Sequence, residues 1–159
     1  MNKFIVLEGL DGSGKSTQAK RISEYLISSG HKCLLTCEPT NSSLGSLARL
    51  VTKGEMTLED ETLALLFAAD RHEHYAKKIA PALAKGDFVV CDRYYYSNIA
   101  YQGSNEQIVK RIFDYNQQVM KQPPDIVFFL ETRPEICLKR LQSTRKDISI
   151  YENLHYLEN

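Results

Sequence analysis

The segment GLDGSGKS at residues 9–16 restricts the fold of this chain more than any other feature. It directly follows the mostly apolar run Phe4–Glu8 and leads into helix-forming residues, so the pattern G-x-x-x-x-G-K-[S/T] lies between a strand and a helix. Glycines let the backbone curl so that successive N–H groups point at phosphate oxygens, and the dipole of the following helix adds partial positive charge. The segment therefore predicts a loop that binds the phosphates of a nucleoside triphosphate.

Two side chains of this loop have chemical roles. Lys15 is placed to reach the terminal phosphates, and the hydroxyl of Ser16 is placed to ligate Mg²⁺. The alternative is a glycine-rich structural turn, but a chance match to the whole pattern is rare. The residues expected to bind the triphosphate are Gly9, Leu10, Asp11, Gly12, Ser13, Gly14, Lys15, Ser16 and Thr17.

Four short apolar runs predict buried strands, because they are rich in Val, Ile, Leu and Phe and do not alternate with polar residues. These runs are Phe4–Glu8, Cys33–Thr36, Phe88–Cys91 and Ile126–Leu130. Helical spacing of apolar residues predicts helices at Ser16–Ser28, at Glu59–Ala84 with a kink or break near Pro81, and at Ile108–Met120. A capping box at Thr132–Glu135 predicts a further helix that runs to about Gln142. Strands that alternate with helices predict an α/β fold with a mainly parallel sheet.

Composition excludes several classes of protein. A length of 159 residues is that of one domain, and 43% apolar with 25% charged residues is typical of a globular protein. Twenty basic residues balance twenty acidic ones, so the basic excess of a general duplex-binding protein is missing. The apolar runs are far shorter than the ~20 residues of a membrane helix. We expect a soluble, cytoplasmic protein with no nucleic-acid or membrane partner.

The cysteines and histidines favour structural roles. The four cysteines contain no CxxC pair and lie in or beside apolar runs, so we expect buried free thiols. The pair His72-x-His74 is expected on the surface of a helix, without the company that metal ligands need.

A small kinase is the leading class of triphosphate-binding protein for this chain. The Asn-Lys-x-Asp segment that recognises guanine in switch proteins does not occur, and a motor ATPase would need a far longer chain. The acceptor of such a kinase should be bound by the segments that follow the second and third strands.

Three further segments occur in order along the chain: EPT at residues 38–40, FAADR at 67–71 and DRYYYSNIAYQG at 92–103. Together with the loop at Gly9–Thr17 they closely resemble the thymidylate kinase family, and the resemblance runs from Lys3 to about Glu152. The segment at 92–103 is the most specific of the set, because the phosphate loop alone occurs in many nucleotide-binding families.

The resemblance implies the fold of P-loop nucleoside monophosphate kinases, with a three-layer arrangement in which helices flank a parallel sheet within one domain spanning residues 1–159. The implied reaction is transfer of a phosphoryl group from ATP to dTMP, giving ADP and dTDP with Mg²⁺. A monophosphate offers an oxygen that is already anionic, so no general base is required and catalysis consists of positioning and charge neutralisation.

The resemblance also implies the roles of individual residues. Arg93 matches the arginine that holds the acceptor phosphate, with an ion pair to Asp92 as the alternative. Phe67 matches the ring that stacks on thymine, with plain core packing as the alternative, and Arg71 matches the donor to a base carbonyl. Asp11 matches the carboxylate near the sugar 3′-hydroxyl, and Tyr101 matches the ring that lies where a 2′-hydroxyl would be.

The complete implied sets are larger. The catalytic residues are Lys15, Arg93, Arg145 and Asp11, and the metal ligands are Ser16 and Asp92, with Glu8 nearby in the surroundings of the metal. The substrate-binding residues are Asp11, Glu38, Arg49, Phe67, Arg71, Arg93, Ser97, Asn98, Tyr101 and Gln102.

Two departures from the family pattern change the expected contacts. Cys37 stands where many members have an arginine, so one phosphate contact is expected either to be missing or to be supplied by Arg49. Position 12 is glycine, as in members that take their catalytic arginine from the lid. The lid is expected at residues 143–149, with Arg145 as its arginine and Arg140 and Lys146 as substitutes; a flexible basic turn is the alternative.

The end of the chain is expected to lie within the helix that follows the lid. Members of the family continue into a fifth strand and a final helix, so we expect both to be missing and Ile126–Leu130 to be left as an apolar sheet edge. The resemblance implies a homodimer to which the Glu59–Ala84 helix contributes. Two alternatives for function stay open: a kinase for another monophosphate or a deoxynucleoside, and a truncated nucleotide-binding protein without turnover.

Overall fold

The computed structural model describes residues 2–120 and 122–144, in which strands and helices alternate along the chain. The elements are β1 (Phe4–Glu8), α1 (Lys15–Ser28), β2 (Cys33–Cys37), α2 (Ser43–Thr52), α3 (Asp60–His74), η1 (Tyr75–Ile79), α4 (Ala80–Ala84), β3 (Phe88–Asp92), α5 (Tyr95–Gln102), α6 (Glu106–Val119), β4 (Ile126–Phe129) and α7 (Pro134–Thr144). The expected lid at residues 143–149 lies mostly outside the described residues, and Arg145 and Lys146 lie wholly outside them.

The described strands form one parallel sheet in the order β2-β3-β1-β4. Asp92, at the end of β3, pairs in register with Leu7 of β1 on one side and with Cys37 of β2 on the other. The carboxyl ends of the strands therefore meet at one edge, where the loops that follow β1, β2 and β3 come together. The predicted α/β fold with a parallel sheet is confirmed.

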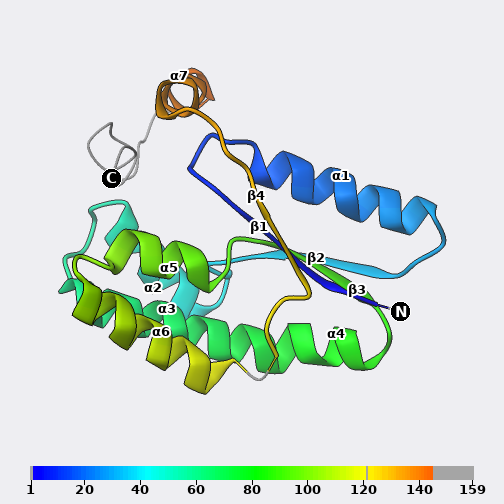
Figure 1. Cartoon of the computed structure of the whole chain (residues 1–159), viewed down its shortest axis with the longest axis horizontal. Coiled ribbons are helices and arrows are strands. Elements are labelled where there is room, and N and C mark those ends of the chain that lie inside the picture. The colour runs from blue at the N-terminus through cyan, green and yellow to red at the C-terminus, as the bar shows by residue number, and fades with distance from the viewer. Residues whose placement is uncertain (1, 121, 145–159) are drawn as a thin grey trace.

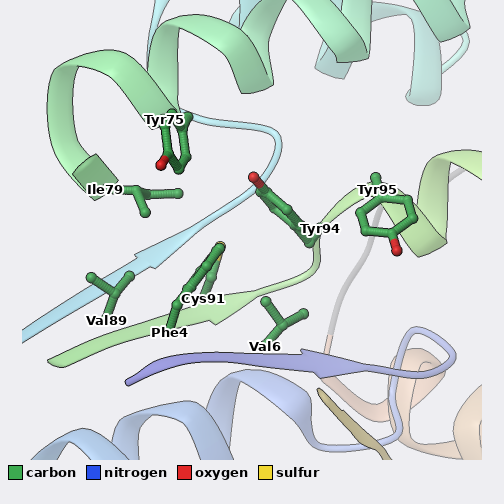
Figure 2. Packing of buried hydrophobic residues seen from close by; sticks show 8 residues of the cluster. All are labelled: Phe4, Val6, Tyr75, Ile79, Val89, Cys91, Tyr94 and Tyr95. Atoms are coloured by element: carbon green, nitrogen blue, oxygen red, sulfur yellow. The ribbon is translucent and has the colours of Figure 1, made fainter. Parts of the chain in front are cut away.

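Helices cover both faces of the sheet (Figure 1), with α1 on one side and the group of α2 to α6 on the other. Alternate residues of β1 and β3 enter the two resulting cores, because successive side chains of a strand point to opposite faces. Ile5, Leu7 and Val90 pack with Ala19 of α1. On the opposite face, Figure 2 shows a second cluster between the strands and η1, the helical turn that carries Tyr75 and Ile79. The cluster is composed of Phe4, Val6, Tyr75, Ile79, Val89, Cys91, Tyr94 and Tyr95.

The two outer strands are less covered than the sequence predicted. All four side chains of β4 are exposed, and Phe129 exposes 69% of its surface. In β2 the residues are half-buried or exposed. Among the described strands, only the two central ones, β1 and β3, have neighbours on both sides, so the expectation of complete burial is wrong for β2 and β4. The expectation that the run at Ile126–Leu130 forms an apolar edge is confirmed for the described sheet.

The long helix expected at Glu59–Ala84 is interrupted close to Pro81, where the sequence predicted a kink or break. A π-helical turn, η1, separates α3 from α4, and Pro81 lies in the first turn of α4. Proline has no N–H and its ring crowds the preceding turn, so a regular α-helix does not continue through it. Two helices, α2 and α5, were not predicted from the sequence.

The cysteines are free thiols, but only Cys91 and Cys137 are buried; Cys33 is half-buried and Cys37 is exposed. The expectation of buried thiols is wrong for Cys37, because it ends an edge strand. Within residues 2–120 and 122–144, the structure contains no helix that combines the length and apolar character needed to cross a membrane.

Candidate active site

The phosphate-binding loop joins β1 to α1, and two of its glycines are fixed by close approaches to the backbone. A Cβ atom on Gly9 would lie 2.7 Å from the carbonyl oxygen of Leu130, and one on Gly12 would lie 2.5 Å from that of Cys137. Both glycines also have positive φ angles, 142° and 81°, which side chains disfavour. The loop is thus held against the segment that follows β4 and against α7, with α1 beginning directly after it.

Lys15, the first residue of α1, is buried and folds back over the loop. Its ammonium donates to the carbonyl oxygen of Leu10 at 2.6 Å and lies 3.9 Å from Asp11 Oδ1. Burial, together with the nearby positive charge of Arg93, lowers the pKa of Lys15 to about 8, against the opposing attraction of Asp11. The site therefore holds a lysine whose charge is poorly compensated by the protein alone.

Arg93 follows β3 in a left-handed backbone conformation with φ 69°, which is uncommon for a residue with a side chain. Its Nη1 donates to Ser97 Oγ at 2.6 Å, its Nη2 forms an ion pair with Asp11 Oδ1 at 2.8 Å, and its guanidinium lies 5.4 Å from the centre of the Tyr101 ring. Burial works to lower the pKa of Arg93, but the adjacent Asp11 outweighs it, so the group stays charged. The ion-pair partner is Asp11, in the phosphate-binding loop, and not the neighbouring Asp92.

Glu8, at the end of β1, caps helix α5. One carboxylate oxygen accepts from the backbone N–H of Tyr94 at 2.8 Å and of Ser97 at 3.4 Å, and the other accepts from Ser97 Oγ at 2.6 Å. These donors belong to the N-cap residue Tyr94 and to the first turn of α5, where N–H groups lack partners within the helix. Burial raises the pKa of Glu8 although these hydrogen bonds oppose the shift. Glu8 thus holds Ser97, which in turn contacts Arg93.

Ser16 and Asp92, the expected metal ligands, lie together. The Ser16 hydroxyl donates to Asp92 Oδ2, while Asp92 Oδ1 is buried and has no hydrogen-bond partner among the described residues. A hydroxyl and a carboxylate are oxygen donors of the kind that Mg²⁺ binds. In the described part of the chain, no three His, Cys, Asp or Glu side chains gather into a metal-binding group.

The acceptor side of the site comprises the residues expected to bind the phosphate acceptor, and among them Arg71 is buried within a network of side chains. Its Nε donates to Glu38 Oε2 at 2.8 Å, and its Nη1 donates to Asn116 Oδ1. Asn116 Nδ2 then donates to Asn98 Oδ1 at 3.2 Å, and Asn98 Nδ2 donates to Gln102 Oε1 at 3.0 Å. The structure therefore brings together Glu38, Arg71, Asn98 and Gln102, which were expected to bind the acceptor.

Phe67 and Tyr101 lie beside one apolar cluster and not within it. Both are half-buried and pack against the buried side chains of Ala48, Val51 and Leu63. Phe67 precedes Arg71 by one helical turn of α3, as the spacing predicted. Burial raises the pKa of the Tyr101 hydroxyl, although the nearby Arg93 opposes the shift.

Arg49 and Arg140 contact backbone oxygens near the two expected binding regions. Arg49 donates to the carbonyl oxygen of Pro39 at 2.8 Å and to Asn41 Oδ1 at 3.1 Å. Arg140, on α7, donates to the carbonyl oxygens of Gly12 at 3.1 Å and Ser13 at 3.4 Å. A cation from α7 therefore already touches the phosphate-binding loop.

Sequence reasoning missed three residues that organise the acceptor side: Asp70, His74 and Asn116. Asp70 accepts from Thr40 N and from the Thr40 and Ser42 hydroxyls at 2.5–2.7 Å, which ties the loop after β2 to α3. His74 was expected on the surface, but its side chain is fully buried against Glu38. Asp70 lies within the FAADR segment and could have been found there, whereas His74 and Asn116 gave no local signal.

Comparisons with known proteins agree with this arrangement. The thymidylate kinase family model matches residues 7–159. A probable thymidylate kinase of Methanocaldococcus jannaschii is 47% identical over 150 residues, covering 92% of this chain and 72% of its own length. The thymidylate kinase of Leptospira borgpetersenii is 37% identical over 155 residues, covering 98% and 76%. A crystal structure of thymidylate kinase from Ehrlichia chaffeensis superposes with a TM-score of 0.74 at 35% identity, over 89% of this chain and 83% of that one. The chain belongs to the thymidylate kinase family.

Proposed function

We propose that the residues described above carry out the reaction of the family, in which this chain transfers the γ-phosphoryl group of ATP to dTMP and forms ADP and dTDP. One observation carries the assignment of the site. Asp11 Oδ1 lies 3.9 Å from the ammonium of Lys15 and 2.8 Å from Nη2 of Arg93. The cation of the triphosphate loop and the cation of the acceptor segment thus converge on one carboxylate, where donor and acceptor phosphates must meet.

On the donor side, residues 9–17 hold the phosphates of ATP through backbone N–H groups, and Lys15 contacts the terminal phosphates. The desolvated and only partly compensated charge of Lys15 supports this role, since its pKa is already lowered to about 8 in the unliganded protein. Phosphate oxygens of a bound nucleotide would balance the positive charge of the Lys15 ammonium.

Magnesium fits beside Ser16 and Asp92, because Oδ1 of Asp92 has no hydrogen-bond partner among the described residues and is an oxygen that could bind a cation. When bound, Mg²⁺ would neutralise part of the phosphate charge and orient the phosphate groups. The protein supplies two oxygens, which suits a cation that usually retains water and phosphate ligands.

On the acceptor side, Arg93 holds the phosphate of dTMP with its planar fork. Ser97, itself held by Glu8, fixes this arginine, so the guanidinium needs little reorganisation when a phosphate replaces Asp11 as its partner. Phe67 stacks on the thymine ring, and Arg71 donates to the base carbonyl that cytosine lacks. Glu38, Arg49, Asn98 and Gln102 complete this side, and Tyr101 fills the space that a 2′-hydroxyl would take.

We also propose one kinase domain over residues 1–159, with its lid near 143–149 and Arg145 as the lid cation. Arg140 supports a lid in this position, because it contacts the phosphate-binding loop; it and Lys146 are the substitutes for Arg145. A cytoplasmic homodimer is proposed from the family resemblance, with α3 in the interface. Exposed Leu65 on α3 and Phe113 on the adjacent α6 support that surface, and light scattering after size-exclusion chromatography tests it.

The assignment is tested by ATP turnover with a panel of acceptors: dTMP, dUMP, dCMP, dGMP, AMP and thymidine. We expect dTMP to give the highest kcat/KM. Arg93→Lys should raise KM for dTMP about ten- to a hundred-fold, because lysine cannot form two parallel bonds to a phosphate. Arg21→Lys, on the exposed face of α1, is the matched control. Nucleotide binding without turnover of any acceptor would refute the proposal.

A further inference from the structure

His74 lies at the end of α3 with its side chain completely buried. Its Nδ1 is 3.0 Å from Glu38 Oε1, and its Nε2 is 2.7 Å from Thr36 Oγ1. Both ring nitrogens therefore have partners, and both partners belong to the segment at the end of β2. No part of the reaction described above uses this histidine.

The partners determine which nitrogen carries the proton. Glu38 already accepts from Arg71 Nε at 2.8 Å through Oε2, so its second oxygen accepts from His74 and Nδ1 must be the N–H donor. In the neutral ring Nε2 is then an acceptor, and it accepts a hydrogen bond from the Thr36 hydroxyl. The result is a directed chain of hydrogen bonds from Thr36 through His74 to Glu38, which Arg71 joins from the other side.

This series of hydrogen bonds fixes the plane of the Glu38 carboxylate. The terminal torsion of a glutamate is broad, so a carboxylate held through one oxygen alone can still rotate. Here Oε2 faces Arg71 and Oε1 faces His74. Arg71 and His74 are three residues apart on α3, a spacing that places both on one face of the helix toward the same carboxylate.

A fixed carboxylate in turn fixes the direction of the arginine fork. The guanidinium is planar and rigid, so holding Nε on Glu38 and Nη1 on Asn116 also sets the direction of Nη2. The guanidinium carbon lies 5.2 Å from the centre of the Tyr94 ring, which restrains it from a further side. The two contacts with Glu38 and Asn116 do not use Nη2.

We propose that His74 is a positioning residue for base recognition: it locks Glu38, which holds Arg71 in the orientation that reads the thymine carbonyl. This inference rests on the proposed role of Arg71. It makes the recognition of the base depend on a side chain that does not itself touch the substrate.

The test compares steady-state kinetics of His74→Ala, His74→Asn and His74→Gln with those of the unaltered protein. The amide nitrogen of asparagine takes nearly the place of Nδ1, whereas that of glutamine takes nearly the place of Nε2. We expect His74→Ala to raise KM for dTMP about ten-fold, with kcat and KM for ATP within two-fold, and to lower the preference for dTMP over dCMP by a similar factor. His74→Asn should restore most of both quantities, and His74→Gln should not.

Two further variants keep the result interpretable. Thr36→Val removes only the contact to Nε2 and should change KM in the same direction by a smaller factor, which provides a reading even where His74→Ala is too unstable to assay. His72→Ala, at an exposed position of the same helix, is the control and should leave KM and the base preference unchanged.

The outcomes separate this inference from the proposed function. If Arg71→Ala raises KM for dTMP and abolishes the preference over dCMP while His74→Ala alters only the melting temperature, the positioning role is refuted and the role of Arg71 stands. Equal recovery by asparagine and glutamine would also refute it, since only volume would then matter. If Arg71→Ala changes neither quantity, the role of Arg71 itself is wrong.

Discussion

The charge of Lys15 makes ATP affinity depend on pH. Its ammonium is buried, donates to the Leu10 carbonyl, and has a pKa lowered to about 8 in the unliganded protein, mainly by desolvation. Triphosphate binding brings negative charge to the ammonium and raises this pKa again, so the complex binds more protons than the free protein above pH 8. ATP affinity must therefore fall as pH rises through about 8.

The size of the effect follows from the titration of one group. With a pKa of about 8, roughly nine-tenths of Lys15 is charged at pH 7 and roughly one-tenth at pH 9. If the charged form is the one that binds, Kd for ATP rises about ten-fold between these values, which corresponds to about 1.4 kcal/mol. Each ATP bound at pH 9 should also take up close to one proton.

Isothermal titration calorimetry at constant Mg²⁺ measures both quantities, with two buffers of different ionisation enthalpy at each pH. Lys15→Met serves as the reference, because every other titrating group remains and only the ammonium is lost. Its ATP affinity should be weak and nearly independent of pH over this range. Lys20→Met, at an exposed position of the same helix, should behave like the unaltered protein.

The reasoning is refuted if Lys15→Met shows the same pH dependence as the unaltered protein, since the titrating group would then lie elsewhere. A constant Kd between pH 7 and pH 9 in the unaltered protein would likewise mean that burial does not lower the pKa of this lysine. In either case the phosphate-binding role of Lys15 would have to rest on turnover measurements alone.

Two other predictions concern the acceptor side. Tyr101→Ala should lower the preference for dTMP over its ribo analogue, because the ring leaves a 2′-hydroxyl desolvated without a partner. The cost is about 1–3 kcal/mol, or about ten- to a hundred-fold in kcat/KM. An unchanged preference in kcat/KM would show that another residue discriminates, and Tyr101→Phe tests whether the ring or its hydroxyl is responsible. Asp70→Asn should reduce the free energy of unfolding by about 2–3 kcal/mol, because an NH₂ group replaces one oxygen of a carboxylate that accepts three hydrogen bonds from Thr40 and Ser42. The midpoint of denaturant unfolding measures this change, and an unshifted midpoint would contradict the prediction.

Much of the framework could be predicted from the sequence because its signals are local. The phosphate-binding loop is defined by eight consecutive residues between a strand and a helix. The strands β1 and β3 are defined by short apolar runs, and the break before α4 is defined by Pro81. The spacing of Phe67 and Arg71 along one helix likewise places them one turn apart on a common face.

The tertiary structure decided what depends on residues far apart in the chain. Helix α5 begins with two tyrosines and was not predicted. Its N-terminus is capped by Glu8, which lies about ninety residues earlier. His74 looks like a surface histidine on its own helix and becomes a buried one only because Glu38 and Thr36 are brought against it. The apolar run Ile126–Leu130 by itself indicates only a buried strand; the edge position of β4 was expected from the family resemblance, and the described sheet has β4 at its edge with all four side chains exposed. Local sequence indicates most of the strands and helices of this chain. The partners of a buried polar group are determined only when the chain is folded, since hydrogen bonds and burial act between segments that are far apart in the sequence.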